Sequence, residues 1–397
     1  MNDAVWIDGS WRRGSGDVFQ NYCPATGDVA WEGASATAGD VHDAVESARR
    51  AFHGWSRMPQ SERTAILEAY ADEIGKRTDA IAEAISKDMG KALWESRGEA
   101  ATMKAKVAVS IAAQVERAGG KVQESAFGSM HLTHRAHGVM AVYGPFNFPG
   151  HLPNGHIVPA LLAGNTCVFK PSELAPSVAA IMADAFAAAG LPAGVLNIVQ
   201  GGRETGGALL NADINGLLFT GSANTGVFFH KHFAGRPEVI LALEMGGNNP
   251  LIIWDPADVD AAADIAAQSA FLTTGAWDED DIFMGPLVSE QAATNAVEFQ
   301  MMLSKKGGQS LRRLKRMDRG GGFVTAGVID VTNATDIPDE ELFGPLMQII
   351  RVPDFNSALE RANATRYGLS GGLISDDDAL WIQAHSEMRA GILNRNR

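Results

Sequence analysis

The residues whose types and spacing could do chemistry gather in one stretch of the sequence, residues 216–250. It reads GLLFTGSANTGVFFHKHFAGRPEVILALEMGGNNP, with two short apolar runs around a segment of mixed apolar and basic residues at 227–233. A helix that opens directly after a strand points unpaired N–H groups and a positive dipole end at the turn, which suits a phosphate group. The second apolar run delivers Glu244 into a turn with two glycines. The stretch therefore predicts a phosphate cradle and a carboxylate at neighbouring strand ends.

The glycine turn in this stretch has neither the GxGxxG spacing of a dinucleotide site nor the Lys-Ser/Thr of a P-loop. Its residues are Gly221, Ser222, Ala223, Asn224, Thr225 and Gly226. Alone, it is as consistent with an ordinary helix-entry turn as with a phosphate site. The phrase VFKPSE places Lys170 and Glu173 where a strand ends. A carboxylate there could hold a ribose diol and disfavour a 2′-phosphate, although a solvated Lys–Glu pair is the simpler alternative.

Two further side chains are candidates for catalysis. Asn147 lies between the prolines of GPFNFP, where its amide could donate to a developing oxyanion or tie down the loop. Glu244, flanked by apolar residues, could be buried and act as a general base, or accept hydrogen bonds from the turn. His151 and His156 in HLPNGH have no Cys, Asp or Glu beside them at metal-ligand spacing, so no metal site is predicted.

The elements that must position these residues alternate between strand and helix. Residues 167–170 and 195–199 read as strands around a helix at 176–189 that starts at proline and ends before glycine. Further helices are expected at 259–272 and 290–305. Strands and helices that alternate at this spacing predict an α/β fold with parallel connections and a doubly wound sheet.

Residues 121–143 alternate with period two, which predicts an antiparallel hairpin or a projecting strand pair. Because a long two-stranded arm is marginally stable alone, we expect it to pair with another subunit or domain.

Bulk composition narrows the function classes. The 397 residues allow two or three domains, and 33 basic against 47 acidic residues give a net charge of −14. That balance argues against nucleic acid or an anionic membrane as a partner, and no stretch is long enough to span a bilayer. Two cysteines, Cys23 and Cys167, cannot form a disulfide framework, which predicts a cytoplasmic location.

The order of the motifs is more informative than any one of them. GPFNFP, KPSE, FTGSANTG, LEMGGNNP and EELFGP follow one another as in the NAD(P)-dependent aldehyde dehydrogenase superfamily, which the chain resembles from Trp6 to about Asn394. The segment GPFNFPGHLPNGHIVPALLAGN is most similar to the branch that oxidises N-succinylglutamate 5-semialdehyde in arginine catabolism.

The resemblance implies a role for each candidate. Asn147 would be the oxyanion amide, and Glu244 the base that activates hydrolytic water. Lys170 and Glu173 would hold the adenine ribose of NAD, with 221–226 near the pyrophosphate. The remaining two residues, against the nicotinamide ribose and ring, would be Glu341 and Phe343. The implied chemistry has three steps: a thiolate attacks a small aldehyde, a hydride passes to NAD, and water hydrolyses the resulting thioester.

The resemblance also implies a domain organisation. A Rossmann-type NAD-binding domain would comprise 1–120 and 137–246, an oligomerisation β-arm 121–136, and a second α/β catalytic domain 247–397. The family forms dimers and tetramers through the arm and a C-terminal strand.

The sequence departs from the family where the nucleophile should be. The family's cysteine follows FLTTG in a phrase like GQRCTCARR, whereas here FLTTG (271–275) is followed by AWDEDD. Cys23 and Cys167 match other positions, and the family register resumes at GPLVSE (285–290). We therefore expect that an internal block is missing, and that the usual continuation after GILNRNR is missing too, which makes dimer or tetramer assembly doubtful.

The departure predicts that this polypeptide has no aldehyde dehydrogenase activity and binds NAD weakly or not at all. Two alternatives remain: a catalytically dead NAD-binding or structural relative, and a dehydrogenase for another aldehyde.

Overall fold

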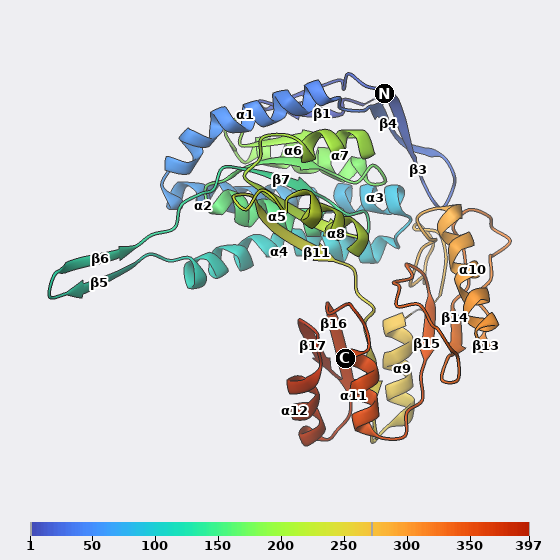
Figure 1. The fold of residues 1–397 in the computed structure, drawn as a ribbon. Helices are drawn as coiled ribbons and strands as arrows, with labels where there is room; N and C mark the ends of the chain where they lie inside the picture. The colour runs from blue at the N-terminus through green and yellow to red at the C-terminus, as the bar shows by residue number, and fades with distance from the viewer. Residues whose placement is uncertain (1, 271–272, 397) are drawn as a thin grey trace. The chain divides into compact units, whose positions relative to one another are not determined.

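The computed structural model describes residues 2–270 and 273–396. The chain forms two compact units, each with its own core (Figure 1). The first comprises the chain up to Cys23 together with Gly27–Glu244, and the second comprises Pro24–Thr26 and the chain from Met245 onward.

The first unit is built on a seven-stranded sheet with the order β11-β10-β7-β8-β9-β1-β2. Strand β7 is parallel to both of its neighbours, β8 and β10, and β8 is parallel to β9. The strands are β1 (Val5–Ile7), β2 (Ser10–Arg12), β7 (Val139–Tyr143), β8 (Thr166–Lys170), β9 (Leu196–Val199), β10 (Gly216–Gly221) and β11 (Ile240–Met245). From β7, the chain first adds β8 and β9 on one side of β7 and then adds β10 and β11 on the other side. The strand order therefore reverses between β7 and β10, the point where such sheets bind ligands.

The central strands β7, β8 and β9 are buried throughout because both faces of the sheet are covered there. Met140 and Val142 of β7 pack into one core cluster, and Val139, Ala141 and Tyr143 into the other. The first cluster contains Trp55 and residues of α2 (Gln60–Lys76), α3 (Thr78–Met89), α4 (Leu93–Arg117), α5 (His151–Leu162) and α6 (Pro176–Ala188). The helices that contribute to the second are α1 (Ala38–Arg57), α7 (Arg203–Leu210) and α8 (Ala223–His232). The predicted doubly wound α/β fold is confirmed.

Local signals fix the ends of several helices. Pro176 opens α6, and Gly190 follows its end with a φ of 81°. Thr37 and Asp40 form a capping box at the start of α1. Helix α8 begins earlier than the sequence pattern at 227–233 suggested, because the side chain of Ser222 caps it.

The predicted arm is shorter than expected. Strands β5 (Lys121–Ser125) and β6 (Gly128–Leu132) form an antiparallel hairpin whose residues are all exposed. It projects from the first unit (Figure 1). Residues 139–143, included in the period-two segment, instead form β7 of the main sheet. Strands β3 (Val18–Tyr22) and β4 (Val29–Ala34) make a second small antiparallel pair.

The second unit holds two three-stranded sheets. The first contains only parallel pairs, in the order β12 (Leu251–Ile253), β16 (Ser370–Ile374), β17 (Ile392–Arg395). The second runs β13 (Gln309–Arg312), β14 (Gly327–Asp330), β15 (Leu346–Ile349), with β13 antiparallel and β15 parallel to β14. The helices are α9 (Val259–Ala270), α10 (Glu290–Lys305), α11 (Phe355–Asn363) and α12 (Asp378–Glu387). Within residues 2–270 and 273–396, no helix has the length and apolar character that a bilayer crossing needs.

Candidate active site

The candidate residues of the first unit follow the carboxyl ends of three adjacent parallel strands. Tyr143, the last residue of β7, pairs with Lys170 of β8 and with Phe219 of β10. This register brings the segments that contain Asn147, Lys170 and Ser222 to one edge of the sheet. It is the edge beside the reversal of strand order, where open α/β sheets bind their ligands.

Lys170 and Glu173 lie side by side at the end of β8. The ammonium of Lys170 is buried; its Nζ lies 2.8 Å from the carbonyl oxygen of Pro171 and 3.5 Å from Oε2 of Glu173. Burial lowers the pKa of Lys170, and the Glu173 carboxylate opposes that shift. The side chain of Glu173 is 49% exposed, so its carboxylate can accept hydrogen bonds from a hydroxyl pair. The alternative of a solvated Lys–Glu pair is thus wrong for Lys170, which is buried, whereas Glu173 is exposed to solvent as that alternative expects.

The glycine turn at 221–226 forms the N-terminus of α8. Ser222 Oγ accepts a hydrogen bond from the backbone N–H of Thr225 at 3.2 Å, which leaves the amides of Ala223 and Asn224 in the unpaired first turn. A Cβ on Gly221 would lie 2.5 Å from the ring of Phe219. The turn is therefore both a capped helix entry and a set of N–H groups at the sheet edge, so the two alternatives do not exclude each other.

Asn147 is half-buried in the loop between β7 and α5. Its Oδ1 accepts a hydrogen bond from the backbone N–H of Phe148 at 3.0 Å. The carbonyl end thus ties down the loop, while no described residue accepts from the Nδ2 end. The side chain is oriented by one end and has donors to offer at the other, as an oxyanion donor requires.

Two histidines of α5 at this edge were considered from the sequence only as metal ligands. His156 Nε2 lies 2.9 Å from Oγ1 of Thr220 in β10. Burial lowers the pKa of His156 to about 4, and the charge of Lys106 adds to the shift. Burial likewise lowers the pKa of His151, with contributions from Lys106 and Lys91. Lys106 lies on α4, distant in sequence, so no local motif could have connected it with these rings.

Glu244 lies at the end of the first unit, in β11. Its side chain is exposed, so the burial expected from its apolar neighbours in the sequence is wrong. The reason is that β11 is the edge strand of the sheet and its residues are exposed or half-buried. An exposed carboxylate can still take a proton from water.

Glu341 and Phe343 belong to the second unit. Burial raises the pKa of Glu341, and a hydrogen bond from the backbone of Gly247 opposes that shift. A Cβ on Gly246 would lie 1.8 Å from Oε2 of Glu341, so the carboxylate occupies the space that this glycine leaves. Phe343 is 49% exposed.

A second contact within the second unit joins the residue before EELFGP to the segment LEMGGNNP. Asp339 Oδ1 accepts hydrogen bonds from Asn248 Nδ2 at 3.2 Å and from Thr365 Oγ1 at 2.7 Å. The structure thus brings together two motifs about ninety residues apart, EELFGP and LEMGGNNP.

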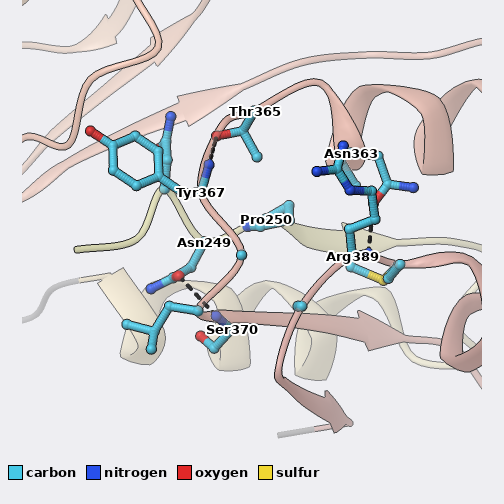
Figure 2. A pocket seen from close by; sticks show the side chains of 13 residues that line it. Asn249, Pro250, Asn363, Thr365, Tyr367, Ser370 and Arg389 are labelled. Carbon is cyan, nitrogen blue, oxygen red and sulfur yellow. Dashed lines mark hydrogen bonds between the residues drawn. The ribbon is translucent and has the colours of Figure 1, made fainter. Parts of the chain in front are cut away.

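The second unit also contains a pocket between its loops (Figure 2). Asn249 Oδ1 accepts from the backbone of Ser370 at 3.3 Å, and Asn363 Oδ1 accepts from the backbone of Arg389 at 2.8 Å. Its polar groups are thus largely bonded to one another. None of the residues predicted for the site lines this pocket.

Neither cysteine is placed to act as a nucleophile. Cys167 is fully buried in β8, and burial raises the pKa of its thiol. A thiol that is kept protonated and out of reach of solvent is inert. Cys23 is also buried and free.

The segment after FLTTG forms a short closed loop. Phe271 and Leu272 lie outside the described residues, but Thr274 bridges to Met284, and Thr273 Oγ1 donates to the carbonyl of Asp281 at 2.9 Å. Glu279 is tied to Arg319 by a hydrogen bond of 2.9 Å from Nη1. Across the part of the chain that the structure describes, no three His, Cys, Asp or Glu side chains gather in a way that could hold a metal ion.

Comparison with known proteins decides the family. The model of the aldehyde dehydrogenase family matches residues 11–277 and 272–397. The chain belongs to the aldehyde dehydrogenase family. N-succinylglutamate 5-semialdehyde dehydrogenase from Burkholderia multivorans is 49% identical to it over 429 positions, which cover 99% of this chain and 88% of the relative. The corresponding dehydrogenase 2 from Caulobacter vibrioides is 50% identical over 434 positions, covering 100% and 89%.

Solved aldehyde dehydrogenase structures share the fold. The indole-3-acetaldehyde dehydrogenase AldA from P. syringae, solved as a cysteine-to-alanine mutant with NAD+, has a TM-score of 0.94 at 26% identity, over 100% of this chain and 89% of AldA. PnpE from Pseudomonas sp. WBC-3, in complex with nicotinamide adenine dinucleotide, has a TM-score of 0.93 at 27% identity, over 100% and 90%.

The alignments to the aldehyde dehydrogenase relatives are longer than this chain. The 429 aligned positions exceed its 397 residues by 32, so at least 32 positions of the B. multivorans enzyme have no counterpart here. The two matches to the family model meet at residues 272–277.

Proposed function

We propose that this chain is by descent an NAD-dependent N-succinylglutamate 5-semialdehyde dehydrogenase, an enzyme that oxidises the aldehyde to N-succinylglutamate in the cytoplasm. About half of its residues are identical to those of relatives with that name, over nearly the whole chain. The observation that carries the proposal in the structure is the shared sheet edge, where Asn147, the Lys170–Glu173 pair and the start of α8 follow adjacent strands. A dehydrogenase for another aldehyde is the alternative within the family.

The residues of the first unit fit the adenosine diphosphate part of NAD. Glu173 offers an exposed carboxylate to a ribose diol, with the buried Lys170 beside it. The first turn of α8 offers unpaired N–H groups to the pyrophosphate. In the second unit, Glu341 and Phe343 would hold the nicotinamide ribose and ring. When bound, NAD supplies the two-electron acceptor of the oxidation.

The chain's own side chains supply the remaining polar steps. Asn147 would donate from Nδ2 to the oxygen of the aldehyde as negative charge develops there. The exposed carboxylate of Glu244 would take the proton of the water that releases the acid.

The covalent step of this chemistry needs a thiolate, and this chain has none in place. Cys23 and Cys167 are its two cysteines; both are buried, and Cys167 lies within the central sheet. The excess of aligned positions and the break in the family match at 272–277 support the loss of the segment that would carry the nucleophile. We therefore propose that the 397-residue polypeptide is a catalytically inactive member that binds NAD weakly.

The first test is turnover. Purified protein, given N-succinylglutamate 5-semialdehyde and NAD, should form no NADH above a no-protein control. The full-length B. multivorans relative serves as the active control under the same conditions. Formation of NADH that requires both the aldehyde and this protein would overturn the proposal of inactivity.

The second test is cofactor binding by calorimetry, with ADP-ribose and 2′-phospho-ADP-ribose as probes. The wild type should bind ADP-ribose better, because the Glu173 carboxylate pairs with the diol and repels a phosphate. Glu173→Gln should reduce the difference in affinity between the two probes. Glu204→Gln, on α7, should leave that difference unchanged. Absence of any ADP-ribose binding would refute the proposed cofactor site.

A further inference from the structure

The carboxylates of an acidic substrate need partners in the binding site, and this requirement extends the proposed function to substrate recognition. N-succinylglutamate 5-semialdehyde carries two carboxylates, and a carboxylate that leaves water must be paired or hydrogen-bonded. In the first unit, three lysines lie close to the elements that follow the carboxyl edge of the sheet: Lys91, Lys106 and Lys170.

Two of these lysines are already neutralised. Lys170 Nζ donates to the carbonyl of Pro171 at 2.8 Å, with Glu173 beside it. Lys91 Nζ lies 3.1 Å from Glu95 and 3.1 Å from Glu99, in addition to stacking over the ring of Phe148. Neither has a charge to spare for a ligand.

Lys106 differs from both. No carboxylate of the described residues lies within ion-pair distance of its ammonium, although the neighbouring Lys104 on the same helix pairs with Asp72 at 3.6 Å. The Lys106 side chain reaches across to α5, where its Cε lies 3.4 Å from the Cβ that a side chain at Gly155 would have. The residue as a whole is half-buried, because its aliphatic stem lies along α5.

The surroundings of Lys106 are those of an incomplete polar site. Nδ1 of His151 is buried and has no hydrogen-bond partner among the described residues. Within helix α5, Gly155 costs about 1 kcal/mol relative to alanine. Among the described residues outside α5, only Lys106 would lie within 4 Å of a Cβ at Gly155, so the glycine leaves space beside the lysine.

This space is connected to the candidate site by direct contacts. His156, the residue after Gly155, contacts Thr220 at the carboxyl end of β10, two residues before the cap of α8. The loop that contains Asn147 leads directly into α5. Lys106 therefore lies beside a helix that follows the loop of Asn147 and contacts the end of β10 through His156.

We propose that Lys106, in the space left open by Gly155 and with His151 beside it, binds a carboxylate of an acidic aldehyde and selects it over neutral aldehydes. The inference rests on the proposed function, because it assigns the substrate class of the same site. Lys106 is a specificity-determining residue that contacts the substrate at a distance from the reacting carbon.

The test measures ligand binding and does not need turnover. The probe is N-succinyl-L-glutamate, titrated into the wild-type protein by calorimetry, with the same molecule converted to its amides as the neutral comparison. Lys106→Gln should weaken binding of the acid about tenfold or more, since it removes a charge-assisted hydrogen bond. Lys106→Arg and Lys104→Gln should bind as the wild type does.

A second variant covers the case in which Lys106→Gln fails to fold. Gly155→Glu places a carboxylate next to Lys106 and should block the acid, whereas Gly155→Gln, of the same size, should weaken it less. Equal binding by the wild type and Lys106→Gln, or equal loss in Lys106→Gln and Lys104→Gln, would overturn the inference.

Parallel titration with ADP-ribose separates this inference from the proposed function. If ADP-ribose binds and the acid does not, the carboxylate site is refuted and the cofactor site stands. If the acid binds in a Lys106-dependent way and ADP-ribose does not bind, the carboxylate site stands and the cofactor site is refuted. Binding of neither refutes both.

Discussion

Single buried charges show how this fold uses polar residues to connect its elements. Asp88 at the end of α3 accepts hydrogen bonds from the backbone and hydroxyl of Ser177 at 2.9 and 3.0 Å, and from Asn21 at 3.2 Å. It therefore caps α6 and holds β3 with one carboxylate. Burial raises its pKa to about 6, and the hydrogen bonds from Ser177 and Asn21 oppose the shift.

This raised pKa predicts a pH dependence of stability. Because the folded state holds the Asp88 proton more tightly than the unfolded state does, this contribution is full below the unfolded pKa near 4 and is lost as pH rises through about 6. Between pH 7 and pH 5, Asp88 should add about 1 kcal/mol to the free energy of unfolding. Urea unfolding at both pH values would measure it. Asp88→Asn should remove this increment, whereas Asp79→Asn at an exposed position should keep it.

At the scale of elements, the start of α8 has a structural role and a proposed binding role, and a single substitution could change both. Ser222 Oγ accepts from the Thr225 N–H, and the same turn presents the free amides proposed for a pyrophosphate. A change that removes the cap frays the turn, and a change that adds negative charge repels the ligand.

Two substitutions at Ser222 separate these roles. Ser222→Ala should lower the free energy of unfolding by about 1 kcal/mol, because it removes the cap. Ser222→Asp should restore the stability, since aspartate caps as well as serine, yet should bind ADP-ribose more weakly than the wild type. Thermal unfolding and calorimetry measure the two effects. If Ser222→Asp binds ADP-ribose as well as the wild type, α8 does not hold the pyrophosphate.

The elements also show what the sequence could predict. Strands and helices around β8 and α6 were predicted nearly to the residue, because apolar runs, Pro176 and Gly190 are local signals. The length of the arm was not predicted correctly. The segments of β5, β6 and β7 have the same period-two sequence pattern, but β5 and β6 are exposed, whereas β7 is buried in the main sheet. The exposure of Glu244 follows from its position in an edge strand, and the role proposed for Lys106 follows from the packing of α4 on α5. Such tertiary contacts have no local sequence pattern.

At the scale of the whole molecule, the projecting hairpin is the feature most suited to self-association. Val122, Phe127, Met130 and Leu132 are all more than half exposed, and the two strands pair only with each other. Exposed apolar side chains on an unpaired strand edge favour contact with another copy.

We therefore expect the hairpin to mediate weak, concentration-dependent association. Sedimentation of the 42.1 kDa chain should show a mass that rises with concentration, and Val122→Asp with Met130→Asp should abolish the rise because charge disfavours edge pairing. Val109→Asp, an exposed apolar position on α4, is the matched control. A rise that persists in the double variant would assign the association to another surface.

The two small sheets of the second unit have a consequence for the fate of the protein in a cell. In the described part of the chain, β12 pairs only with β16 and β15 only with β14, so each sheet ends in an open edge of parallel strand. Ile253 in β12 is 43% exposed, and Ile350, the residue after β15, is 38% exposed. An open strand edge with apolar side chains is a template for pairing with another chain. Aggregation through these edges should therefore lower the amount of soluble protein in a cell.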